Sequence, residues 1–240
     1  MTTAPAPIPR RSGPRRVHVL MLAGLATMIA VGIALLVRGN GSTHFSSAPQ
    51  GSGVAAAEVR TLPAFDRIDL AGANLVSVSI GPRQAVVVHG DDNLLRRITT
   101  DVRDRTLVVD NSGSYTSKVP MKVEVVVPAL ASATLSGSGM IAIGGIEARA
   151  LSVSVPGSGL LTAAGRVDNL DAVLGGTGEC LLGDLVARDA TAVLQGSGRL
   201  DVHATRSLDA RVDGTGVIRY TGRPGRISRA VNGTGTIVEE

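Results

Sequence analysis

The sequence has very few aromatic residues and only one cysteine among its 240 residues. Tryptophan is absent, and the aromatic residues are Phe45, Phe65, Tyr115 and Tyr220. Aromatic side chains bury the most apolar surface per residue, so a core has to be assembled here from Ala, Val, Leu and Ile. Because Cys180 has no partner in the chain, an intrachain disulfide is excluded.

Acidic residues are missing from positions 1–38, although the chain has 20 of them. Five of the 24 Lys and Arg residues lie in this stretch, so the remainder has 19 basic against 20 acidic residues, a net charge of −1. The high isoelectric point, near 10.0, is therefore due to the arginines of the N-terminal segment. A nucleic-acid-binding protein needs a basic face on its folded part, and the charge balance after position 38 argues against that function.

Residues 17–37 are an apolar stretch of 21 residues without Lys, Arg, Asp or Glu. As an α-helix they would span about 31 Å, close to the roughly 30 Å hydrocarbon core of a bilayer. Four arginines precede the stretch and Arg38 follows it, which by the positive-inside rule places the N-terminus in the cytoplasm. The sequence thus predicts a basic cytoplasmic tail at 1–16, a single transmembrane α-helix at 17–37 in the inner or cytoplasmic membrane, and a periplasmic or extracellular domain.

A cleaved signal peptide is the alternative interpretation of the same stretch. Its apolar part would usually be about 7–15 residues long and end at a small-x-small cleavage site. Ser46 and Ala48 have that spacing, but the cut would fall before Pro49, which is unfavourable. The longer apolar stretch favours an uncleaved anchor, followed by a flexible linker rich in Gly and Ser at 38–54.

A Gly-Ser/Thr-Gly triplet recurs six times at intervals of 18 to 20 residues. The copies are 137–139, 157–159, 176–178, 196–198, 214–216 and 233–235. A repeat this short cannot bury its own apolar side, so the copies must stack on one another. We expect the six central hydroxyl residues to line up as a ladder along the stack.

Apolar residues alternate with other residues on both sides of each triplet, which is typical of strands with one face inward. Four places after the first glycine, for example, the residues are Ile141, Leu161, Cys180, Leu200, Ile218 and Ile237. The pattern predicts an all-β fold, a parallel β-helix over 55–240 with one coil per repeat of about 19 residues from 137 to 240. Glycines would mark the corners, where small size or a positive φ is needed. The less regular strands at 60–127 would form further coils or a capping sheet.

The order of several weak motifs resembles one bacterial family. The stretch Leu62–Gly72 is similar to the opening of the domain named putative auto-transporter adhesin, head GIN domain. A Val-x-Val strand at 76–78, a Gly-Asp-Asp-Asn turn at 90–93, a strand at 107–109 and the Gly-Ser-Gly repeats follow in the family's order. The resemblance covers about residues 58–240. It implies a right-handed parallel β-helix outside a bacterial cell or in the periplasm, with no catalytic residues to assign.

The reactive side chains of the domain are better explained as structural or solvated. Cys180 occupies a position that other repeats fill with Ile or Leu, so we expect a core residue. His89 and His203 lack the spacing of metal ligands. The sequence Asp91-Asp92-Asn93 is read as a turn rather than a calcium loop. We therefore predict no catalytic, cofactor-binding or metal-binding residues.

Paired carboxylates need separate attention, because parallel β-helices include polysaccharide lyases and hydrolases. Asp171 and Asp209 share a phase in the repeat and would lie two coils apart, about 10 Å at the usual strand spacing. That distance is near the upper limit for an inverting glycosidase. Tyr220 is the only aromatic residue in the repeats, so solvated surface acids are favoured.

Three hypotheses for the function follow. The first is a non-enzymatic, membrane-anchored β-solenoid outside the cytoplasm that serves as an adhesin, an envelope interaction module or a scaffold, with a cell-surface glycan or protein as partner. The second is a carbohydrate-active enzyme on the same fold. The third is a structural protein that associates end to end through exposed strand edges.

Overall fold

The structure, a computed structural model, describes residues 48–240 and is built almost wholly of β-strands. Its one helical element within this range is a short 3₁₀ helix, η1 (Leu95–Arg97). No helix among these residues is long and apolar enough to cross a membrane. The predicted tail at 1–16 and the predicted anchor at 17–37 lie outside the described residues.

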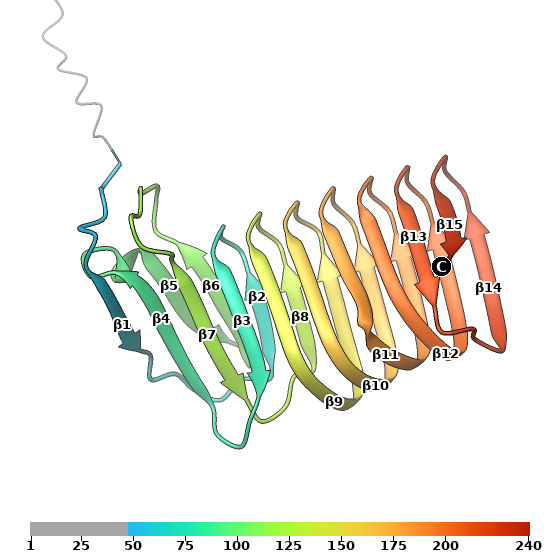
Figure 1. The fold of residues 1–240 in the computed structure, drawn as a ribbon, viewed down its shortest axis with the longest axis horizontal. Helices are drawn as coiled ribbons and strands as arrows, with labels where there is room; N and C mark the ends of the chain where they lie inside the picture. Colours follow the sequence, from blue (N-terminus) through green and yellow to red (C-terminus); the bar gives the residue numbers. More distant parts are fainter. Residues whose placement is uncertain (1–47) are drawn as a thin grey trace, which may run out of the picture. The chain divides into compact units, whose positions relative to one another are not determined.

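Four long strands form the regular part of the molecule, and each makes one coil of a parallel solenoid (Figure 1). They are β9 (Met140–Val155), β10 (Leu160–Leu174), β11 (Glu179–Leu194) and β12 (Arg199–Val212). Each bends once, near a shift in register such as the one between Ala163 and Gly165. The first halves pair with one another on one side, here called face A, and the second halves on the opposite side, called face B.

Inward side chains of successive coils stack in registered columns and fill the space between the two faces. Leu161, Cys180, Leu200 and Ile218 are Cα partners from coil to coil, and all four are buried. Parallel strands of this kind bury the apolar positions that the period-two pattern of the sequence marks. The predicted all-β solenoid is therefore confirmed for the repeats, as is the core position of Cys180.

The Gly-Ser/Thr-Gly triplets form the tight corner that leads from face B of one coil to face A of the next. A Cβ atom on Gly176 would lie 1.9 Å from the carbonyl oxygen of Gly157, and one on Gly178 would lie 2.4 Å from that of Gly159. None of the triplet glycines has a positive φ. Their small size, and not a left-handed backbone, is what the corner requires.

The central residues of the triplets are exposed and stacked, as the sequence predicted. The hydroxyl of Thr215 donates a hydrogen bond of 2.9 Å to the hydroxyl of Ser197 one coil earlier. The backbone N–H groups of Ser158, Ser197 and Thr215 each donate to a carbonyl oxygen of the preceding corner, that of Thr215 to Gly196. The corners thus extend the hydrogen bonding of the sheets around the turn.

The stack does not follow chain order before residue 137. Five short strands there pair in parallel and continue the two faces: β2 (Arg67–Leu70), β3 (Leu75–Ile80), β6 (Thr106–Asn111), β7 (Lys122–Val127) and β8 (Ser132–Leu135). On face A, β3 lies between β7 and β9, so the chain turns back before it continues the solenoid.

Three antiparallel strands close the N-terminal end of the solenoid: β1 (Ala55–Val59), β4 (Ala85–Asp91) and β5 (Ile98–Arg103). The segment 60–127 therefore provides both further coils and a cap. At the other end, the last coil consists of β13 (Val217–Thr221), β14 (Arg226–Val231) and β15 (Thr236–Glu239).

The buried carboxylate of Asp91 holds the start of the described chain against the solenoid. It accepts hydrogen bonds from the backbone N–H groups of Gly53 at 2.6 Å, Lys118 at 2.9 Å and Val119 at 3.2 Å. Gly51 packs so closely on this carboxylate that a Cβ there would lie 2.4 Å from an oxygen. Residues 49–53, which the sequence assigns to the flexible linker, thus lie hydrogen-bonded to the solenoid.

We predict that Gly176→Ala destabilises the protein by about 1–3 kcal/mol, because the added methyl group overpacks the corner against the Gly157 carbonyl. Gly183→Ala in the same coil is the control, since its Cβ would meet no atom within 4 Å. Urea unfolding of both variants measures the difference. Equal stability of the two would contradict the steric role of the corner glycines.

We predict that Asp91→Asn loosens residues 49–53 and that acid does the same in the parent protein. Burial opposes ionisation of Asp91, but the N–H groups of Gly53, Val119 and Lys118 outweigh it and lower the pKa of the carboxyl. Its contribution to stability is therefore full above the unfolded pKa of about 3.9 and is lost as the pH falls through the lower folded value. Amide hydrogen exchange of Gly53 measures both effects, and unchanged protection in the variant would refute the role of Asp91.

Candidate functional site

Outward side chains on face B line up in a column that contains a polar residue in every coil. This column, here called the polar ladder, consists of Ser132, Ser152, Asp171, Thr191, Asp209 and Ser228. Neighbouring members belong to hydrogen-bonded parallel strands and are therefore about 4.8 Å apart along the solenoid axis. Each has at least one oxygen that can hydrogen-bond, so the ladder is a periodic array of polar groups.

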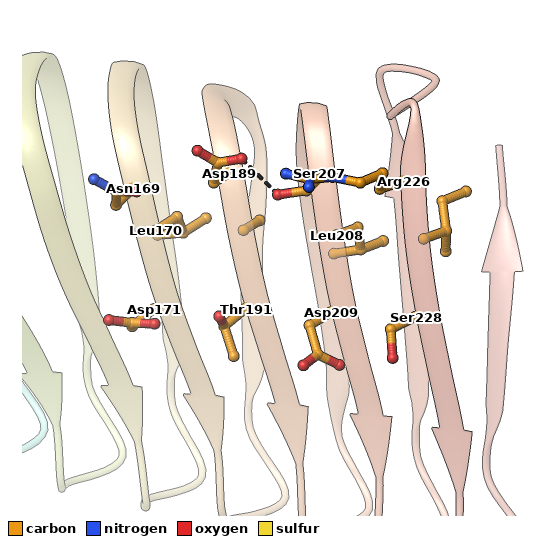
Figure 2. Close-up of a pocket in the computed structure, with 12 residues that line it drawn as sticks. Asn169, Leu170, Asp171, Asp189, Thr191, Ser207, Leu208, Asp209, Arg226 and Ser228 are labelled. Carbon is orange, nitrogen blue, oxygen red and sulfur yellow. Dashed lines mark hydrogen bonds between the residues drawn. The ribbon is translucent and has the colours of Figure 1, made fainter.

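A second polar column runs beside the ladder, and the two border a groove (Figure 2). The second column consists of Asn169, Asp189, Ser207 and Arg226. The groove has a volume of about 570 Å³ and crosses four coils, with the backbone at Leu170, Ala190, Leu208 and Ile227 between its two rows of side chains. Its long direction is the solenoid axis, so it fits an extended molecule better than a compact one.

Asp189 is the one carboxylate of the groove that the protein itself neutralises. Its side chain accepts hydrogen bonds from Arg206, with Nε at 2.7 Å, and from the hydroxyl of Ser207 at 2.5 Å. The Arg206 guanidinium first, and then the Ser207 hydroxyl, lower the pKa of this carboxyl to about 2. Asp189 therefore stays ionised over the physiological pH range and fixes the position of the Ser207 hydroxyl.

Asp171 and Asp209 are the two carboxylates that the sequence singled out, and the structure brings them into one groove. They share the polar ladder with Thr191 between them, so they lie two strand spacings apart, about 10 Å. Within residues 48–240 neither carboxylate forms a hydrogen bond or an ion pair with another side chain. Both are exposed and can accept hydrogen bonds from a ligand.

The other residues considered from the sequence do not join this groove. Cys180 is buried on the inside, where burial first and the charge of Asp201 second raise the pKa of its thiol. His89 hydrogen-bonds Glu124 at 3.1 Å on face A, and His203 lies on face A as well. Among residues 48–240 no group of three His, Cys, Asp or Glu side chains could hold a metal ion.

The segment Asp91-Asp92-Asn93 forms a turn, and all three side chains bond within the protein. Asp91 holds the backbone of Gly53, while Asp92 and Asn93 bond the hydroxyl and the N–H of Ser52. These contacts fix the entry of the chain. The turn that the sequence predicts is therefore present.

Sequence reasoning missed the Asp189–Arg206 pair and the second polar column. The signal was present, because Asp189 and Ser207 occupy corresponding places in consecutive repeats. Arg206, however, lies one residue before Ser207 and next to a shift in register between β11 and β12. A shift of this kind breaks the constant repeat spacing, so counting residues could not bring Arg206 to Asp189.

Solved structures of bacterial proteins align with most of this chain. A putative adhesin from Bacteroides fragilis aligns with a TM-score of 0.65 and 23% identity, over 80% of this chain and 99% of that chain. A putative lipid binding protein from Parabacteroides distasonis aligns with a TM-score of 0.49 and 22% identity, over 80% of this chain and 99% of that chain. At 23% identity the likeness to the Bacteroides fragilis protein concerns the fold alone. No curated protein sequence matches the chain.

The sequence itself matches a family over most of the solenoid. Residues 64–224 fit the family described as putative auto-transporter adhesin, head GIN domain. The match begins just before β2 and ends after β13, so it covers the irregular coils, the capping strands β4 and β5, and all four long strands. The chain belongs to this family.

Proposed function

We propose that this chain is an adhesin-like binding module, and not an enzyme, that contacts its ligand through the polar ladder of face B. The observation that carries the proposal is the unbroken column of polar side chains from Ser132 to Ser228, one in each coil. These side chains face solvent, so neither the packing of the core nor the formation of the corners requires them to be polar. The adhesin family and the fold shared with an adhesin-named structure support the same role.

The ligand that suits this surface is an extended glycan lying along the solenoid axis. The length of one pyranose unit in an extended glycan is close to the strand spacing of about 4.8 Å. Each coil could then offer one hydrogen bond to each sugar unit, worth about 0.5–1.5 kcal/mol. Asp171 and Asp209 accept hydrogen bonds from sugar hydroxyls and disfavour acidic sugars by charge repulsion.

The placement of the module follows from the N-terminal sequence. An apolar stretch at 17–37 with four preceding arginines favours a single-pass anchor whose N-terminus is cytoplasmic. The Gly- and Ser-rich segment after it then tethers the solenoid outside the cytoplasmic membrane. Outside the cytoplasm a chain with one cysteine depends on its continuous core for stability, which the solenoid supplies.

A carbohydrate-active enzyme is the second candidate, because Asp171 and Asp209 face one groove. Their spacing of about 10 Å lies at the far limit for an inverting pair, which also needs one of the two acids protonated. The groove is open along its length, so it does not shield reacting groups from water. These features favour binding over hydrolysis.

We predict that the double variant Asp171→Ala, Asp209→Ala weakens glycan binding about tenfold or more, because two hydrogen-bond acceptors are lost at about 1 kcal/mol or more each. A glycan array probed with the protein, followed by titration of the best neutral glycan, measures the change. Asp184→Ala is the matched control, since Asp184 is exposed away from the groove. Equal loss in the control, or degradation of a polysaccharide by the parent protein, would overturn the proposal.

We predict that the full-length protein stays in the membrane fraction after alkaline extraction and keeps its N-terminal residues. The reason is that an uncleaved helix at 17–37 would span the bilayer. Mass spectrometry of the mature protein determines the N-terminus, and protease added to spheroplasts tests whether the solenoid is outside. A mature chain that begins after residue 38 would show a cleaved signal peptide instead.

A further inference from the structure

The last coil of the solenoid has a bare strand edge on each face. Within residues 48–240, β14 pairs only with β12, and β15 pairs only with β13. The N–H and C=O groups on the far side of both strands therefore have no strand partner in this part of the chain. An edge of this kind is a template for pairing with another chain.

Apolar surface is exposed on the same coil. Ile227, Val231 and Val238 are 41%, 47% and 45% exposed. Ile227 and Val231 stand in the inward columns of Leu208 and Val212, which are fully covered. The last coil therefore presents core-type side chains that a further layer would bury.

Two opposite charges occupy inward columns of this coil, where earlier coils have apolar residues. Arg229 follows Ala210 on face B, and Glu239 follows Tyr220 on face A. The Arg229 guanidinium lies 4.9 Å above the Tyr220 ring, and the Tyr220 hydroxyl donates a hydrogen bond of 3.0 Å to Glu239. The two charged groups are 4.0 Å apart across the core and about half exposed.

The two bare edges run in opposite directions, because the chain turns back at the corner between β14 and β15 (Figure 1). A two-fold axis parallel to the strands would place β14 of one copy beside β15 of a second copy. The paired strands would be antiparallel, and the pairing would occur twice. The same operation places Arg229 over Glu239 of the second copy.

We propose that this end binds a second copy of the chain, C-terminal coil to C-terminal coil, in a two-fold dimer. The surface is self-complementary in the way that a two-fold interface requires, since each copy supplies one positive and one negative group. A two-fold axis perpendicular to both faces would instead set β14 against β14 and Arg229 against Arg229, which charge repulsion disfavours. Head-to-tail stacking would use the opposite end, whose edge strands are β1 and β5. It would not bring Arg229 of one copy to Glu239 of the other, so charge exchange between these two residues tells the two arrangements apart.

Such a dimer joins two molecules at the ends opposite to their linkers. Two anchored copies that pair in this way would therefore lie on opposing membranes, so the protein would act as its own receptor between cells. This cellular consequence rests on the proposed function, whereas the dimer does not. The end of one coil is smaller than a typical stable interface, so many copies on each surface would have to act together.

Charge reversal tests the dimer. Residues 48–240 contain every core residue of the solenoid and form one compact unit, so they can be studied alone. Sedimentation velocity should show a dimer fraction that rises with concentration. Arg229→Glu alone and Glu239→Arg alone should each weaken the dimer tenfold or more, because both leave like charges facing across the axis. The two single variants mixed together should pair with each other, and the double variant should dimerise again.

The control is Arg166→Glu on the exposed side of β10, which should leave the dimer unchanged. Thermal unfolding checks that each single variant is folded. If a single variant does not fold, the double variant still tests the proposal, because it exchanges the two charges and so keeps an ion pair. A protein that stays monomeric up to millimolar concentration would overturn the proposal and make the charged pair a guard against edge pairing. Dimers that persist equally in both single variants would overturn it as well.

Vesicles separate this inference from the proposed function. The full-length chain is reconstituted into phosphatidylcholine vesicles of two colours, and clustering is followed by fluorescence cross-correlation. Clustering that Arg229→Glu abolishes supports contact between membranes. If residues 48–240 dimerise but the vesicles do not cluster, the dimer stands and its role between membranes is refuted.

Discussion

The close stacking of backbone at the glycine corners is the constraint on which the rest of the molecule depends. Successive coils can lie one strand spacing apart only if the corner of one coil rests directly on the carbonyl groups of the next, as Gly176 does on Gly157. That spacing brings the inward columns into contact and so builds a core without large aromatic residues. It also sets the regular distance between the outward side chains of face B. Stability and the proposed binding surface therefore have the same geometric origin.

Much of the fold could be predicted from the sequence, because each coil of the solenoid repeats the same alternation of inward and outward residues around its triplet. Cys180, Leu161 and Leu200 could be placed in one inward column by counting from the triplets, and the structure agrees. The stacking of β3 between β7 and β9 could not be deduced, because strand order before the repeats depends on contacts between distant segments and not on a period.

The candidate site could be predicted only in part, because only some of its residues follow the repeat. The common phase of Asp171 and Asp209 was evident from the repeat, and with it one side of the groove. Arg206 reaches Asp189 beside a break in register, and Arg229 and Glu239 occupy inward columns that earlier coils fill with apolar residues or Tyr220. Such departures from the period are set by local sterics and by the ends of a stack. Two ion pairs of the molecule, Arg206–Asp189 and Arg229–Glu239, lie at such departures.

The position of β3 between two strands that come later in the chain has a consequence for biogenesis. A polypeptide that emerges residue by residue during synthesis cannot complete its N-terminal end until β7 has appeared to cover one side of β3. Once that nucleus exists, each later coil can add to a finished surface, so growth becomes one-dimensional. Duplicating a whole coil would then lengthen the protein without disturbing either end, whereas an insertion of a few residues near β3 would block assembly at its first step.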